Sequence, residues 1–394
     1  MNEEKATRYH RLRRRALLIA AAWRVTLLAG LAASGLSQAL HAALASAVQP
    51  LPATLRFPLT VLLVVAAIAT MQEFCLLPAS FFSGHILERR YGLSRQPAAR
   101  WLRDHAKAAA LSLLFSGLAA VWVYAWLAAV PAWWWLPAWA GLAAAGVATA
   151  WAAPVLLLPL FFRFVPLAEG PLRDRLLALA ARAGVPALGA FEWRVGDRTS
   201  RANAALTGMG RTRRIIVSDT LLADYRPEEV EAVLAHELAH HLHHDIWKGL
   251  AVDAAAGLAA LVAAGAALRA AAGPMGLESL ADPAGLPVAA LAVTAASWVA
   301  APIQNAVSRA HERRADRTAL DLTGNVEAFV TAMRRLGARN LAEPSPAALA
   351  RLFFHTHPPI DERIASAAAW TARQGAPPGA GAAAPRPRVR GGAA

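Results

Sequence analysis

Six long apolar stretches, separated by polar segments, dominate the pattern along the sequence. They cover about residues 16–36 (with a possible extension to 47), 57–78, 108–130, 136–162, 246–272 and 286–303. An α-helix needs about 20 apolar residues to cross the hydrocarbon core of a bilayer, and each stretch comes close to this length or exceeds it. The pattern predicts an α-helical polytopic membrane protein with about six transmembrane helices.

Two of these stretches leave alternatives open. The first follows a basic segment with Lys5 and five arginines, as in a signal peptide. It is longer than the ~7–15 apolar residues of a signal sequence, so we expect an uncleaved span. Arg24 and Glu73 lie inside the first and second stretches. Because charges are costly in lipid, we expect these two side chains to pair, to reach the membrane surface or to line an internal cavity.

The polar segments divide the chain into predicted regions. Residues 1–162 form an N-terminal membrane domain with four spans, and residues 246–303 hold two further spans. Two long polar regions, residues 163–245 and 304–373, flank the last two spans. Residues 374–394 are rich in glycine, alanine and proline, which is typical of a disordered tail.

Composition and charge agree with this picture. Hydrophobic residues make up 57% of the chain and charged residues 17%, below the ~25% of soluble domains. The net charge is +14, but no nucleic-acid-binding module is present, so we relate the arginines to membrane orientation and anionic lipid. The single cysteine, Cys75, excludes an internal disulfide framework and a thiolate metal site.

The basic residues also predict the orientation. Arginines are frequent at the N-terminus, in the loop after the second span and in both long polar regions, whereas the other loops carry at most one basic residue. The positive-inside rule places both termini and both polar regions in the cytoplasm. The compact loops and the arginine- and alanine-rich bias indicate a bacterial chain, hence an inner-membrane protein.

One motif in the first polar region carries chemistry. His236, Glu237 and His240 form the pattern H-E-x-x-H, in a predicted helix that begins near Pro227. The buried face of this helix is predicted from a repeat at every fourth residue, Val230, Leu234, Leu238 and Leu242. Residues four apart share a helix face, so both imidazoles can reach one metal ion with the carboxylate beside it. This arrangement binds zinc and activates a water for hydrolysis.

Catalytic zinc takes three protein ligands, so a third is needed from elsewhere in the chain. The candidate is Glu312, just after the sixth span, and Asp316 one turn later is placed to accept the outer N–H of a ligand histidine. Alternatively, both acids pair on a solvated helix face with Arg309, Arg313 or Arg314. The other nearby histidines, His241, His243, His244 and His311, are expected to be bystanders.

Two short strands are predicted before the motif helix, at residues 191–195 and 215–217. The polar region is therefore expected to be a small α+β unit. An exposed strand beside an active-site helix can bind a peptide substrate in an extended conformation.

Taken together, these residues resemble the type I CAAX prenyl endopeptidases, membrane zinc proteases of the gluzincin kind. The resemblance covers about residues 57–370. Its elements are the loop with Tyr91–Ser94, the run Pro154–Phe162, Asn203–Ala204 with Ile215–Leu222, Ser308–Asp316, and His357–Pro359 with Glu362–Ile364.

The resemblance implies a set of roles. His236, His240 and Glu312 would bind one Zn²⁺ per chain, and Glu237 would be the general base. Asn203 and His357 would flank the site and hold the substrate backbone or the oxyanion. The family fold is a helical barrel around a water-filled chamber, with the zinc site at its cytoplasmic end. Eukaryotic members have seven spans, one more than expected here. Membrane-associated or lipid-bearing polypeptides are the expected substrates, and the lipid bilayer is the expected partner.

Two other functions would also account for part of this pattern. Heat-shock-type quality-control proteases of the HtpX kind share the zinc motifs, but they have fewer spans and lack the Tyr91–Ser94 loop. A non-catalytic zinc-binding membrane transporter or scaffold would also explain the spans, Arg24 and Glu73. It gives no reason for an acid, Glu237, between two ligand histidines.

Overall fold

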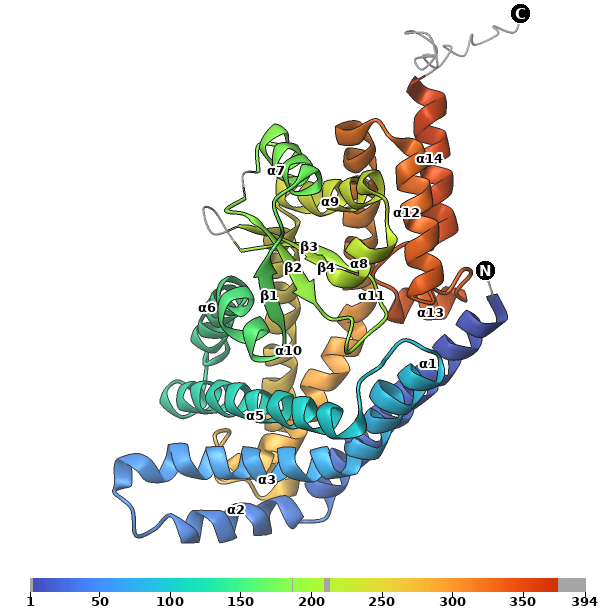
Figure 1. The fold of residues 1–394 in the computed structure, drawn as a ribbon. Coiled ribbons are helices and arrows are strands. Elements are labelled where there is room, and N and C mark those ends of the chain that lie inside the picture. The colour runs from blue at the N-terminus through green and yellow to red at the C-terminus, as the bar shows by residue number, and fades with distance from the viewer. Residues whose placement is uncertain (1–2, 186, 209–212, 375–394) are drawn as a thin grey trace, which may run out of the picture.

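The computed structural model describes residues 3–185, 187–208 and 213–374 (Figure 1). Within these residues, six helices are long and apolar enough to cross a membrane, which confirms the expected number. These candidate spans are Lys5–Ala33, Ala53–Arg90, Ala98–Ala129, Trp135–Leu160, Asp245–Met275 and Pro283–Thr323. A small sheet and several shorter helices lie together beside one end of the long helices (Figure 1). The tail predicted from residue 374 onwards lies almost entirely outside the described residues.

The N-terminal half is a bundle of helices. They are α1 (Glu3–Ala33), α2 (Leu36–Ala47), α3 (Ala53–Phe81), α4 (Leu87–Arg90), α5 (Ala98–Ala129) and α6 (Trp135–Ala152). The possible extension of the first span to residue 47 is wrong. Gly35 adopts a left-handed conformation with φ +77°, which glycine tolerates, and the chain turns there to start the separate helix α2.

The fourth span is less regular than expected. After α6 the chain forms a π-helical turn, Ala153–Leu157, and then a 3₁₀ turn, Leu158–Leu160. Pro154 and Pro159 lie in these turns. Proline cannot donate a backbone hydrogen bond, so it interrupts the regular α-helical ladder.

A four-stranded sheet follows, with strand order β1-β2-β4-β3. The strands are β1 (Arg163–Pro166), β2 (Ala190–Arg194), β3 (Ala204–Thr207) and β4 (Arg214–Ser218). The two predicted strands correspond to β2 and β4, which pair in parallel at the centre. Antiparallel β1 and β3, which were not predicted, form the edges.

The helix with the H-E-x-x-H motif, α9 (Pro227–Leu242), packs against the sheet and against neighbouring helices. Its neighbours are β3, α7 (Pro171–Arg182), α11 (Leu286–Thr323) and α12 (Val326–Arg339). Of the predicted stripe, Val230, Leu234 and Leu238 are fully buried and Leu242 packs at the edge of the same core. The core contacts therefore fix this helix while its other face stays available to the histidines.

The last two spans are α10 (Asp245–Met275) and α11, which pack along each other (Figure 1). Helix α11 does not end with the predicted apolar stretch at residue 303 but continues to Thr323. A single helix thus connects the membrane bundle with the region around α9. The remaining helices are α8 (Asp219–Asp224), α13 (Ala348–Phe354) and α14 (Ile360–Gln374).

The two charged residues inside the first spans line a common cavity of about 340 Å³ between α1, α3 and α5. Glu73 pairs with His105, whose Nε2 lies 2.5 Å from its carboxylate. Of the three expectations for Arg24 and Glu73, the structure therefore supports the internal cavity.

Candidate metal centre

The start of α9 fixes the orientation of the motif helix. Pro227 occupies its first position, and the Glu229 carboxylate accepts a hydrogen bond of 2.8 Å from the backbone N–H of Arg226. This contact satisfies an N–H that has no partner within the helix. His236 and His240 then lie one turn apart on the same face, with perpendicular rings whose centroids are 4.9 Å apart.

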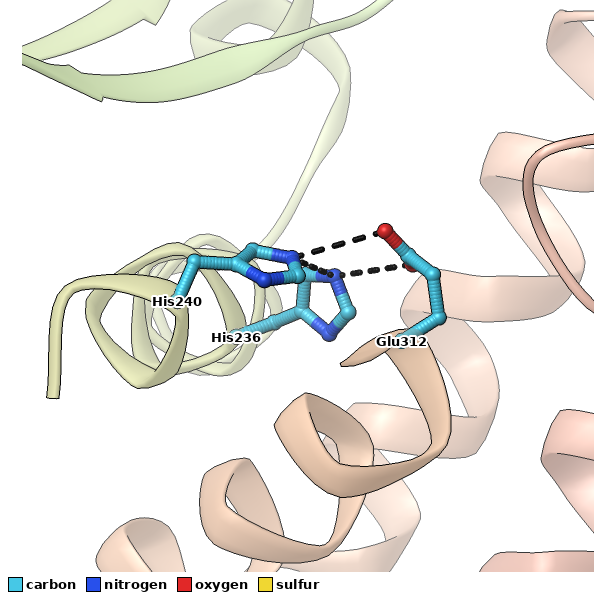
Figure 2. Close-up of side chains that lie close together, drawn as sticks. All are labelled: His236, His240 and Glu312. Atoms are coloured by element: carbon cyan, nitrogen blue, oxygen red, sulfur yellow. Dashed lines mark hydrogen bonds and ion pairs between the residues drawn. The ribbon is translucent and has the colours of Figure 1, made fainter. Parts of the chain in front are cut away.

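Glu312 on α11 completes a three-residue cluster with these histidines (Figure 2). Its Oε2 lies 3.3 Å from Nε2 of His236, and its Oε1 lies 3.4 Å from Nε2 of His240. The two Nε2 atoms are 3.3 Å apart. The predicted third ligand therefore comes from a different helix, 72 positions after His240 in the sequence, and its carboxylate faces the Nε2 atoms of both histidines.

The spacing of this cluster fits a metal ion. In a tetrahedral site with bonds of about 2.0–2.1 Å, ligand atoms lie about 3.3–3.4 Å from one another. The distance between the two Nε2 atoms and the distance from each of them to its nearer Glu312 oxygen fall in this range. Oε2 of Glu312 is buried and accepts no hydrogen bond. A buried carboxylate oxygen without a hydrogen-bond donor is costly, and a bound cation would remove that cost.

Asp316 contacts the outer nitrogen of His236. Its Oδ1 lies 2.9 Å from Nδ1 of His236. The guanidinium of Arg363 on α14 donates two hydrogen bonds of 2.5 and 2.9 Å to the same carboxylate. With Nδ1 as the donor to Asp316, Nε2 presents its lone pair to the metal position.

The remaining predicted residues line one cleft beside the cluster, with a volume of about 430 Å³. Its walls include Asn203, His236, Glu237, His357 and Arg363. Glu237 is half-buried, and Asn203 is exposed just before β3. His357 lies in the loop between α13 and α14 with its Nε2 3.2 Å from Oε1 of Glu312, and its side chain is 61% exposed.

The electrostatics of the cluster also suit a cation. Burial lowers the pKa of His236, but the nearby carboxylates of Asp316 and Glu312 outweigh this effect and raise its pKa to about 9. Burial also lowers the pKa of His240, but the contact with Glu312 outweighs this effect, so the pKa is raised. The carboxylates thus attract positive charge to the imidazoles, and a metal ion supplies that charge in place of protons. Burial raises the pKa of the Glu237 carboxyl.

The structure adds two residues that the sequence did not single out. Arg363 was visible only as part of the segment Glu362–Ile364, without a role. Asp245 ends the predicted polar region and has no predicted role, yet its Oδ2 lies 3.0 Å from Nδ1 of His240. The bystander histidines have other partners: His241 contacts the Leu206 carbonyl, His243 contacts Thr318, and His311 lies 3.9 Å from Asp245.

Comparison with known proteins gives matches over most of the chain. Residues 166–371 match the family model of Peptidase family M48. Residues 2–163 match the model described as CAAX prenyl protease N-terminal, five membrane helices. In the described part of that segment, four helices are long enough to span a membrane, and α2 is a further helix of 12 residues.

Individual relatives agree with the family models. The chain is 30% identical over 285 residues to Uncharacterized metalloprotease YhfN of Bacillus subtilis, covering 71% of this chain and 67% of that protein. It is 28% identical over 304 residues to the CAAX prenyl protease 1 homolog of Arabidopsis thaliana, covering 76% and 71%. The fold is similar to that of S. mikatae Ste24p, with a TM-score of 0.81 and 22% identity over 93% of this chain and 88% of that one. The chain therefore belongs to Peptidase family M48, as a multi-pass membrane metalloprotease of the CAAX prenyl protease 1 kind.

Proposed function

We propose that the protein is a zinc endopeptidase that cleaves membrane-associated or lipid-bearing polypeptides on the cytoplasmic side of a bacterial inner membrane. The observation that carries this proposal is the cluster of His236, His240 and Glu312 beside a cleft that His236 and Glu237 line. Imidazole nitrogens and a carboxylate oxygen are the donors of a catalytic zinc site, and three of them leave one position open.

The residues around this position have distinct roles in the proposed reaction. When bound, zinc would polarise the scissile carbonyl and acidify a water. Glu237 takes the proton of the attacking water and delivers it to the leaving amine. Burial raises its pKa, so its carboxylate is a stronger base than an exposed carboxylate. Asn203 and His357 are far apart in the sequence but line the same cleft. They bind the substrate backbone or the developing oxyanion.

The sheet supplies a binding surface for an extended peptide. β3 is an edge strand, and Ala202, Asn203 and Ala204 at its start line the cleft. A peptide added to this edge would be held by main-chain hydrogen bonds, which tolerate different sequences. The side chains of Val233 and Met333 in the same cleft offer apolar contacts to the substrate.

The family match and the membrane helices support a membrane-linked substrate. The curated relatives include proteins named CAAX prenyl protease 1 homolog, and the match to the N-terminal model favours this kind of protease over the heat-shock type. The cleft lies among elements that adjoin the ends of α10 and α11, so substrates tethered to the bilayer would be concentrated near it.

The first experiment is Glu237→Gln in purified full-length protein. The variant should keep zinc bound but lose cleavage of a fluorogenic peptide by about 100-fold or more, since a general base contributes about 10²–10⁴-fold. Glu228→Gln, on the same helix but paired with Arg175 away from the cleft, is the matched control and should cleave like the parent. Cleavage by Glu237→Gln at the parental rate would refute the mechanism.

The second experiment identifies the substrates. The same inactive variant should retain bound polypeptides in cell membranes, which mass spectrometry can identify after purification. Enrichment of lipid-bearing proteins over the Glu228→Gln control supports the proposed class. Enrichment of unmodified, misfolded membrane proteins would instead indicate a quality-control protease.

A further inference from the structure

Each of the two candidate ligand histidines has a carboxylate at its outer nitrogen. For His236 this is Asp316, held by Arg363. For His240 it is Asp245, whose Oδ2 lies 3.0 Å from Nδ1. The second contact is not part of any motif considered above, and it comes from a different element of the fold.

Asp245 is buried in a strongly basic environment. Its side chain is only 6% exposed. The Arg314 guanidinium on α11 donates a hydrogen bond to its Oδ1. Two further groups face the same oxygen, Nδ1 of His311 at 3.9 Å and Nζ of Lys248 at 4.0 Å. These contacts are all made to Oδ1, which leaves the other oxygen, Oδ2, to the imidazole of His240.

Each candidate ligand histidine thus contacts an aspartate that an arginine holds in place. In one, Arg363 holds Asp316 against His236. In the other, Arg314 holds Asp245 against His240. We propose that Asp245 is a positioning residue that fixes the ring and the tautomer of His240 for zinc, with Arg314 clamping its carboxylate. The inference rests on the zinc site of the proposed function and extends it to a pair of residues at the junction of α9, α10 and α11.

The contact between Asp245 and Arg314 also links two membrane-spanning helices to the metal cluster. Asp245 is the first residue of α10, a candidate membrane span, and Arg314 lies on α11 two residues after Glu312. The carboxylate therefore joins the start of one long helix to the helix that carries a metal ligand. If α10 shifts along α11, Asp245 moves away from His240, so zinc affinity depends on how these two helices pack.

A simpler role would be an ion pair that only holds α10 to α11. The two roles differ in what a charge-free replacement does. An ion pair that acts only in packing can be replaced by two neutral polar groups without effect on the metal. A positioning carboxylate cannot, because an amide is a weaker acceptor for the imidazole N–H and no longer raises the basicity of the ligand.

The test is zinc affinity of the full-length protein in detergent, measured by competition with a chromophoric chelator. Asp245→Asn should bind zinc about 10–100-fold more weakly than the parent, the usual effect of losing such an outer partner. Asp253→Asn is the matched control, because Asp253 also links α10 to α11, through Gln304 at 2.8 Å, without touching a ligand histidine. It should bind zinc like the parent.

The double variant Asp245→Asn with Arg314→Gln guards against unfolding, since it leaves no unpaired buried charge. It should recover the thermal stability of the parent and yet keep the weakened zinc affinity. The visible absorption spectrum of the cobalt-substituted protein should shift in both Asp245 variants and not in Asp253→Asn, because it reports ligand geometry.

Three outcomes separate the possibilities. Parental zinc affinity in Asp245→Asn would overturn the positioning role while leaving the proposed function intact. Parental affinity in the double variant would reduce the pair to a packing contact and also overturn it. Failure of the parent to bind zinc would reject the proposed function itself, and this inference with it.

Discussion

Arg363 and Asp316 form an ion pair beside the metal cluster whose side chains are only 9% and 2% exposed. Both groups have lost their hydration, so each depends on the other and on His236 for stabilisation. The pair is therefore expected to contribute to stability only as a unit. Removing one partner leaves a buried charge without compensation, whereas most surface ion pairs can be broken at small cost.

Arg363→Ala should destabilise the protein by about 3–5 kcal/mol because it strands the Asp316 carboxylate. Thermal unfolding in detergent checks this. Arg351→Ala is the control: its ion pair with Glu362 is about one third exposed on both sides, and its loss should cost less than about 1 kcal/mol. Equal unfolding midpoints for the two variants would show that the Arg363–Asp316 pair contributes no more to stability than an exposed pair does.

At the scale of elements, the short junction between α9 and α10 holds a residue in an unfavourable backbone conformation. His243 and His244 lie between the two helices, and His244 has φ +57° and ψ +34°, a left-handed conformation that is unfavourable for residues other than glycine. This conformation separates α9 from α10, and Asp245 at the start of α10 contacts His240. The strained residue His244 therefore directly precedes the residue that contacts the candidate ligand His240.

Replacing His244 tests this explanation. His244→Gly should stabilise the protein by roughly 0.5–1 kcal/mol, since relief of the left-handed strain exceeds the added entropy of the unfolded chain. His244→Val should destabilise it, because a branched Cβ is poorly tolerated at positive φ. Unfolding midpoints give the comparison. The opposite order of the two variants would exclude strain at this position.

For the whole molecule, α11 connects the membrane bundle with the metal cluster, because the same helix passes through a candidate span and presents Glu312 (Figure 1). The cluster can therefore form only when α11 is packed correctly against both α10 and α9. This arrangement explains why ligands so far apart in sequence can act together.

Orientation is a property of the whole molecule that the loop charges predict. In a Cys75→Ser background, Gln49→Cys in the turn after α2 should react with a membrane-impermeant maleimide added to the outside of spheroplasts. Arg373→Cys at the end of α14 should react only after lysis. The reverse labelling pattern would contradict the cytoplasmic position proposed for the cleft.

Sequence predicted the features that follow a local period. The six spans follow from hydropathy, and the shared face of His236 and His240 follows from their spacing. Glu312 became a candidate through its place just after the sixth span, and the resemblance of the segment Ser308–Asp316 implied the same role. Strands β1 and β3 have only four residues each, too few for an alternating pattern.

The sequence did not predict the roles of Arg363 and Asp245 for a different reason. Arg363 meets Asp316 across 47 positions, and Arg314 meets Asp245 across 69. No local period marks such pairs, because only the packing of separate helices brings them together. For the same reason the sequence left open whether Glu312 and Asp316 face a metal or pair with neighbouring arginines.

The most direct test of the central claim compares zinc content and cleavage in Glu312→Ala and in the parent. The account predicts one zinc per chain in the parent and loss of both zinc and cleavage in Glu312→Ala. Asp321→Asn, on the same helix and bonded to Trp370, should retain both. One full equivalent of zinc together with parental cleavage in Glu312→Ala would contradict the claim that α11 supplies the third ligand.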